Sequence, residues 1–333
     1  MGAASDSPAP ARTRGGATRW AVLARSPLVG PLVALLVAVV VFAVITDTFL
    51  RPTNLSLILQ QSVVIGILAV AQTIVILTAG IDLSIGAVAV LGTIVLAKVG
   101  GEHGPLVAIV AAAAVLAVVG LVNGALVAWV HLPPFIVTLG VFTAMYAATQ
   151  LYAGSQVYPV AKGPLTWLGT KLSFGGLTIT TGVLAMLLLY LLAWYVLSHT
   201  AAGRHLYAVG GAPEAARLTG IRSGRVLVIT YLVAGVVAVV AAWAALGRIP
   251  NADPNAYQNA NLETITAVVI GGTSLFGGRG SVLGTLVGTL IVAVLRNGLT
   301  QAGVDNLYQN IATGALVIAA VALDQVSRRR VQT

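Results

Sequence analysis

Two groups of polar residues interrupt otherwise apolar stretches of this chain at helical spacing. Gln61 and Gln72 are eleven residues apart, about three helical turns, so a helix places both on one face. Thr143, Tyr146 and Gln150 follow an i, i+3, i+7 pattern that also selects one face. Amides and hydroxyls donate and accept hydrogen bonds without a charge to desolvate, which suits an uncharged, polyhydroxylated ligand on a translocation path. The same residue types also link packed membrane helices, and the spacing leaves both interpretations open.

A polar stretch at 199–225, HTAAGRHLYAVGGAPEAARLTGIRSGR, separates two long apolar runs. Residues 213–218 predict a short helix, because proline suits the first helical position, an acid suits the first turn, and Gly220 is placed to end it. Such a helix between membrane spans is poorly placed to form a core, so we predict that residues 203–222 bind a partner protein. Its candidate contacts are Glu214, Ala215, Ala216 and Arg217.

Two glycine-containing segments break the apolar pattern. In the first, Gly80 to Gly86, Asp82 precedes Ser84, and an acid so close to the bilayer is costly unless its oxygens are satisfied. Asp82 either caps the following helix or takes part in gating or partner contact. The second break, 271–281, contains Gly277 and Gly278. It lacks the G-x-x-x-x-G-K-[ST] pattern of a phosphate-binding loop, so we interpret it as a tight turn.

Several kinds of chemistry are disfavoured by the residue inventory. There is no cysteine, which excludes disulfides and thiolate chemistry, and the four histidines are scattered without the spacing of a metal site or a catalytic triad. We therefore expect no catalytic residue, no metal and no cofactor in this chain. Glu263 lies at the outer start of the span predicted at 264–276, where a first-turn acid favours the helix dipole; substrate contact is the alternative.

The composition is that of an all-α, polytopic membrane protein. Of 333 residues, 58% are hydrophobic and 8% are charged, against about a quarter charged in average soluble domains. We predict about ten transmembrane helices in one bundle. They cover 28–46, 55–78, 84–99, 105–130, 133–153, 177–197, 226–247, 264–276, 281–300 and 307–323.

The basic residues indicate topology rather than nucleic-acid binding. The net charge is +9, but no basic stripe with interleaved aromatic residues is present. With both termini inside, N-in and C-in, twelve of the eighteen Lys and Arg residues fall on the cytoplasmic side. We expect residues 1–26 to be a disordered cytoplasmic leader, 27–324 one transmembrane domain, and 325–333 a basic cytoplasmic tail. The outer segments 154–176 and 248–262 are either a docking surface or simple connections.

Four stretches resemble the permease subunits of bacterial ABC importers for ribose and related monosaccharides. They are LTAGIDLSIGAVAVLGT at 77–93, NGALVAWVHLPPFIVTLG at 123–140, GRHLYAVGGAPEAARLTGI at 203–221 and ITAVVIGGTSLFGGRGSVLGTLVGTLI at 265–291. The stretches occur in the family's order and leave about the first 50 residues unmatched. Glu214, Ala215, Ala216 and Gly220 match the family's coupling segment.

The resemblance implies a set of partners in the bacterial cell membrane. It implies a second permease subunit, in a homodimer or heterodimer, and a separate ATP-binding cassette subunit on the cytoplasmic side that binds ATP and Mg²⁺. It also implies an extracytoplasmic sugar-binding protein. The alternatives are an ABC permease for branched-chain amino acids, an ion-coupled secondary transporter and a membrane scaffold. The spans carry no acid of the kind that ion coupling usually uses, and the sequence does not name the sugar.

Overall fold

The computed structural model describes residues 28–332, and at positions 174, 320, 323, 324 and 326–332 it describes the backbone alone. The leader expected over residues 1–26 lies outside the described residues, as do most side chains of the expected basic tail. The helices are α2 (Val29–Ile45), α3 (Pro52–Leu77), α4 (Ile85–His103), α5 (Pro105–Ala128), α6 (Pro134–Ala153), η1 (Pro164–Gly169), α7 (Thr181–His199), α8 (Ala201–Gly211), α9 (Pro213–Leu218), α10 (Ser223–Arg248), α11 (Ala260–Ile270), α12 (Val282–Gln301) and α13 (Asn306–Gln332). The strands are β1 (Tyr158–Pro159), β2 (Lys171–Phe174), β3 (Leu177–Thr180) and β4 (Asn251–Ala252).

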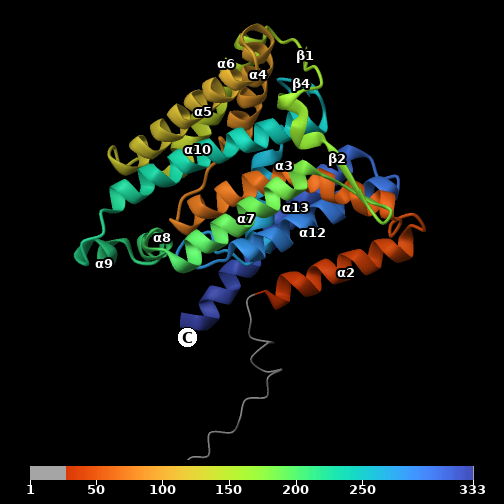
Figure 1. Ribbon diagram of the computed structural model, residues 1–333. Coiled ribbons are helices and arrows are strands. Elements are labelled where there is room, and N and C mark those ends of the chain that lie inside the picture. Colours follow the sequence, from red (N-terminus) through yellow and green to blue (C-terminus); the bar gives the residue numbers. More distant parts are fainter. Residues whose placement is uncertain (1–27, 333) are drawn as a thin grey trace, which may run out of the picture.

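Apolar helices make up the body of the molecule (Figure 1). Within the described part of the chain, seven of them are long and apolar enough to cross a membrane: α3, α4, α5, α6, α7, α10 and α12. The shorter apolar helices α2 and α11 have 17 and 11 residues. The span expected at 264–276 is therefore a shorter helix, because the chain turns at Gly271 and Gly272 and remains irregular up to Ser281.

Helix α3 is the centre of the bundle. Of the 18 residues in its most apolar stretch, 83% are buried, against 17% in the corresponding stretch of α6. The helices α7, α10, α11 and α12 pack around α3, while α5 and α6 lie on the far side of α4 and α10. The apolar outward faces of α5, α6 and α7 would be costly in water, and they suit a lipid environment or a neighbouring subunit.

The strands form two short antiparallel pairs. β1, β2 and β4 lie in the outer segments 154–176 and 248–262, whereas β3 takes up the first four residues of the span predicted at 177–197, so the helix there begins only at Thr181. Tyr158 of β1 lies opposite Ala252 of β4, so the two long segments expected outside the membrane pair with each other. The β2–β3 hairpin rests on α3, where Thr178 donates its backbone N–H to the Ser56 hydroxyl at 2.8 Å. Together these contacts tie the connections to the end of the bundle that we call the strand end.

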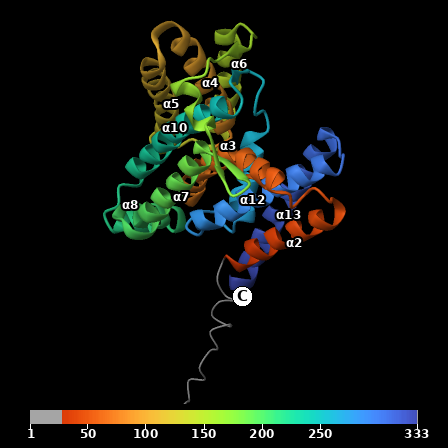
Figure 2. The ribbon, with the colours of Figure 1, turned by 45° about the vertical axis from the view of Figure 1, so that its right-hand side comes forward.

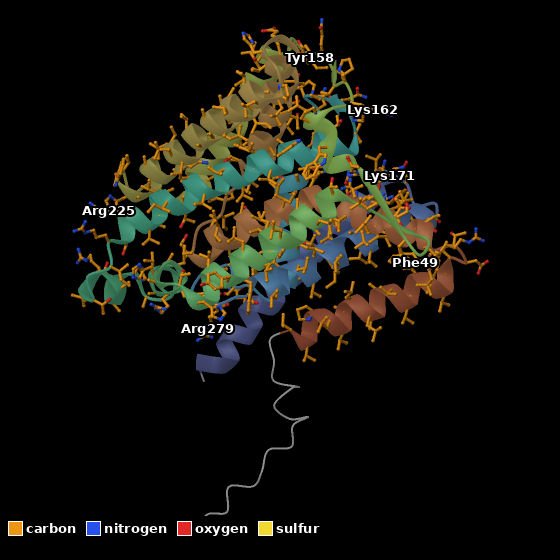
Figure 3. All side chains as sticks on the ribbon, viewed as in Figure 1. Phe49, Tyr158, Lys162, Lys171, Arg225 and Arg279 are labelled. Carbon is orange, nitrogen blue, oxygen red and sulfur yellow. The ribbon has the colours of Figure 1, made fainter. Side chains whose placement is uncertain are left out.

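The opposite end carries α8 and α9, and we call it the α9 end. Arg225 and Arg279 lie there, whereas Tyr158, Lys162 and Lys171 lie toward the strand end (Figure 3). The beginning of α2 and the end of α13 lie near each other in both ribbon views (Figure 2). The bundle thus has two chemically different ends, and each is a candidate functional site.

Candidate functional site

The predicted partner-binding helix is present at the expected residues, as α9. Glu214, Ala215 and Arg217 are exposed, while Ala216 turns inward with 4% of its surface accessible. Glu214 and Arg217 form an ion pair at 3.4 Å on the exposed side. Next to them, Leu218 is 85% exposed. The helix therefore presents a small mixed surface of one apolar side chain and one ion pair.

Gly220 ends this helix through a specific backbone geometry. Its N–H donates to the carbonyl of Arg217, and the N–H of Ile221 donates to the carbonyl of Ala216, both at 3.0 Å. This pair of bonds is the Schellman motif, which needs a left-handed residue, and Gly220 has φ +86°. A side chain added at Gly220 would meet no described atom within 4 Å, so only the backbone conformation demands glycine there.

Helix α8, which sequence analysis did not separate from α9, joins the two breaks in the bundle. The N–H of Gly278 in the second break donates to the carbonyl of Leu77 at the end of α3, at 3.0 Å. Gly210, in the last turn of α8, lies directly against both groups, and a Cβ there would overlap the Leu77 oxygen. We call this contact of Leu77, Gly210 and Gly278 the backbone junction.

Tyr207 adds a side-chain contact between α8 and the second break. Its hydroxyl donates to the carbonyl of Gly280 at 2.9 Å. Partial burial raises the pKa of the Tyr207 phenol above its ordinary value of 10.0, so the hydroxyl remains a donor even in mildly alkaline solution. Gly277 and Gly278 both have left-handed φ, +78° and +69°, and a Cβ on Gly277 would crowd Ala79 of the first break. The two breaks expected from sequence thus meet each other.

The first break is satisfied from within the bundle. Asp82 is 4% exposed, and one of its oxygens accepts from the backbone N–H and the hydroxyl of Ser84 at 2.8 and 2.6 Å. Asn123 of α5 donates to the same Ser84 hydroxyl at 3.0 Å. Asp82 therefore satisfies the backbone N–H of Ser84, the residue just before the first turn of α4, and its carboxylate is buried within the bundle.

The left-handed turn of the first break falls on an unexpected residue. Ala79 has φ +60°, whereas Gly80 does not adopt a left-handed conformation. Glycine is needed at position 80 for space, because a Cβ would lie 2.8 Å from the Tyr231 hydroxyl and 3.1 Å from a Val75 methyl group. Sequence patterns identify the turn but not which of the two residues carries the strain.

The strand end contains two open cavities separated by residues 256–259. The larger, which we call the Glu263 cavity, has a volume of about 420 Å³, and Gln61 lines it together with Arg248, Tyr257 and Arg296. The smaller, the Tyr146 cavity, has about 340 Å³ and is lined by Tyr146 and Phe142 of α6. Two of the predicted path residues thus line different cavities.

The other predicted path residues lie outside these cavities. Gln72 is completely buried in α3, and its amide has no hydrogen-bond partner among the described residues. Gln150 donates to the Asn255 side chain at 2.7 Å, which anchors the segment between the cavities. The Thr143 hydroxyl bonds to the carbonyl of Leu139 in its own helix, at 3.2 Å, on an exposed face.

Sequence reasoning considered Glu263 as a substrate contact, but it missed the two arginines that line the same cavity, Arg248 and Arg296. Glu263 in the first turn of α11 forms an ion pair with Arg296 of α12, and Arg248 lines the same cavity. A signal was present, because Arg296 is one of only two charged residues within the predicted spans. Its partner Glu263 lies 33 residues away, and no local pattern connects the two.

A bundle of apolar helices with polar cavities at one end and an exposed helical arm at the other defines a membrane transport protein. Residues 54–321 match the family model described as branched-chain amino acid transport system / permease component. The chain therefore belongs to this family of permease components, and it is a transport subunit rather than an enzyme. It is a multi-pass inner-membrane protein. No solved structure matches the chain.

Curated relatives cover nearly the whole chain. It is 43% identical to the fructose import permease protein FrcC of Rhizobium meliloti over 312 residues, 91% of this chain and 87% of the relative. It is 36% identical to the ribose import permease protein RbsC of Bacillus subtilis over 303 residues, 89% and 92% of the two chains. It is 33% identical to the probable ABC transporter permease protein YphD of Escherichia coli over 295 residues, 88% of each chain.

The backbone junction leads to a test with a matched control in the same helical turn. Gly210→Ala places a methyl group on the Leu77 carbonyl oxygen, so α8 must move away from the breaks. We expect a loss of about 1–3 kcal/mol in unfolding free energy, measured by thermal unfolding of the purified protein. Gly211→Ala is the control, because it changes helix propensity in the same way. Its Cβ meets only the Gly278 Cα, at an ordinary contact distance of 3.6 Å, so we expect its unfolding free energy to be no lower than that of the parent. Equal stability of the two variants would contradict the junction.

Proposed function

We propose that this chain is the permease subunit of an ATP-driven importer for a monosaccharide, such as a pentose, a hexose or a related polyol. The observation that carries the proposal is its likeness, over about nine tenths of its length, to relatives named as fructose and ribose import permeases. The Glu263 cavity supports it, because amides, hydroxyls and one ion pair line a space of about 420 Å³. Such a lining suits a neutral sugar better than the apolar side chain of a branched amino acid.

The translocation path begins at the cavities of the strand end. Gln61 and Tyr146 lie at the start of the path, and Gln150 holds the segment that separates the two cavities. Gln72, deep in α3 with an unsatisfied amide, becomes available to the sugar when the helices move. Thr143 lies on the exposed face of α6, where a second permease subunit would cover it.

Residues 203–222 couple the permease to its ATPase. The exposed ion pair and Leu218 of α9 form the surface for the ATP-binding cassette subunit, which holds ATP and Mg²⁺. When this surface moves, α8 moves with it and displaces Gly278 and Leu77. The packed helices then shift as rigid bodies and do not unfold locally. Gly80, Asp82, Ser84 and Gly277 shape the breaks that such a movement would shift. A sugar-binding protein delivers the cargo at the strand end.

The chain crosses the membrane about ten times with both termini in the cytoplasm. Helices α2, α11 and α13 complete the seven long apolar helices in this scheme. The domain division into a leader at 1–26, a permease domain at 27–324 and a tail at 325–333 follows the same orientation. The position of Arg225 and Arg279 at the α9 end supports it, because cytoplasmic connections are enriched in basic residues (Figure 3).

The transport proposal is tested by uptake into vesicles. The chain is reconstituted together with the ATPase and the binding protein that copurify with it from native membranes. We expect labelled ribose or fructose to accumulate only when ATP is present, and labelled leucine to stay outside. Accumulation of leucine would favour the amino-acid alternative. Uptake that follows an ion gradient without ATP would favour a secondary transporter.

The orientation is tested by single cysteines, because the native chain contains none. Cysteine at Arg222, an exposed residue just before α10, should be protected from a membrane-impermeant thiol reagent in intact cells. Cysteine at Asn255, exposed at the strand end, should react. Both should react after the cells are opened. The reverse pattern in intact cells would overturn the orientation.

A further inference from the structure

The ion pair of Glu263 and Arg296 has an unusual setting for a membrane protein. The Glu263 side chain is 8% exposed, whereas that of Arg296 is 51% exposed and borders the Glu263 cavity. The two residues lie on the neighbouring helices α11 and α12, which also pack through apolar residues. A charged pair at such a place is costly against lipid, so the cavity that it borders must be filled with water or ligand.

Two features of its surroundings favour the charged form of the Glu263 carboxylate and partly offset the cost of its burial. Glu263 occupies the first turn of α11, where the helix dipole favours a negative charge, and Arg296 balances that charge from the side. Glu263 still has acceptor capacity beyond this bond, since a carboxylate accepts at both oxygens. Arg296 uses one terminal nitrogen for the bond and keeps other N–H donors.

Together these groups offer what vicinal hydroxyls require. One hydroxyl donates to the carboxylate, its neighbour accepts from the guanidinium, and the Gln61 amide on the facing helix can do either. Tyr257 adds an aromatic ring to the same wall, and its left-handed backbone, φ +54°, is the kind of strain that accompanies functional sites. The volume of about 420 Å³ lies in the usual range for small-molecule sites.

We propose that Glu263 and Arg296 form a sugar-binding subsite in this cavity, at which vicinal hydroxyls of a monosaccharide bind before translocation. The inference rests on the proposed sugar-import function and goes beyond it by assigning the site. It also replaces the interpretation of Glu263 as a residue that only favours the helix dipole. We expect binding at this subsite to be weak, because the sugar must leave it for the cytoplasm.

Protection of a single cysteine measures occupancy of this subsite directly. Thr300 lines the Glu263 cavity but not the Tyr146 cavity, and it is exposed, so Thr300→Cys provides the only thiol in the chain at this site. The complete transporter in proteoliposomes is treated with an impermeant maleimide, with and without millimolar D-ribose or D-fructose. We expect the imported sugar to slow labelling several-fold, and L-leucine to have no effect.

The variant Glu263→Gln in this background tests the role of the carboxylate. It keeps the size of the side chain and removes its charge, so we expect roughly tenfold weaker protection, as befits the loss of a charge-assisted hydrogen bond. Glu102→Gln, an exposed acid at the end of α4, is the matched control and should keep full protection. If Glu263→Gln fails to assemble, Arg296→Lys serves instead. It keeps the positive charge but loses the planar guanidinium and its paired N–H donors, so it should also weaken protection.

The outcomes separate this inference from the function on which it rests. Full protection in Glu263→Gln, or in Arg296→Lys where that variant replaces it, would overturn the subsite. Sugar uptake without any protection in the parent would also overturn it, while leaving the import function standing. An absence of both uptake and protection would overturn the two together.

Discussion

One contact between main chains joins α8, at the α9 end of the molecule, to the central helix α3. The N–H of Gly278 bonds to the carbonyl of Leu77, and Gly210 of α8 lies against both without a side chain between them. Because glycine allows the backbones to touch, a displacement of α8 reaches the end of the central helix α3 with no flexible side chain to absorb it. The same α3 carries Gln61 to the Glu263 cavity. The exposed α8–α9 segment and the Glu263 cavity are therefore both in contact with the central helix α3.

The breaks in the bundle obey the rule that buried backbone groups need partners. Irregular backbone in a membrane protein is tolerated where protein surrounds it. Here the Thr138 hydroxyl bonds to the carbonyl of Ile81 at 2.9 Å, and that of Tyr207 bonds to Gly280. Asp82 and Ser84 satisfy the start of α4. The bonds of Thr138 and Tyr207 come from neighbouring helices, so these parts of the breaks depend on the assembled bundle, which makes them suited to respond when the helices move.

Local signals allowed much of this structure to be predicted from the sequence. Apolar runs located the helices, and proline, acid and glycine located α9, because each of these signals acts within a few residues. Features that depend on distant residues were not predictable. Nothing in the spacing of Glu263 and Arg296 indicates that they pair, and nothing in the glycines of either break indicates that Leu77 and Gly278 bond. Ala79 rather than Gly80 is left-handed because the N–H groups of these two residues bond to the carbonyls of Ile76 and Val75 in a Schellman motif. The need for glycine at position 80 comes from the distant residue Tyr231, which no local pattern indicates.

The central claim is that α9 and its glycine end couple an ATPase to the breaks, and replacement of Gly220 tests it most directly. Asparagine tolerates the left-handed conformation and valine does not, while the space around Gly220 admits either side chain. The measurement is ATPase copurification together with ATP-driven sugar uptake in reconstituted vesicles. The account predicts that Gly220→Asn behaves like the parent, whereas Gly220→Val inserts normally but loses the ATPase or hydrolyses ATP without uptake. If Gly220→Val binds the ATPase and transports like the parent, residues 203–222 are an ordinary connection and the account is wrong.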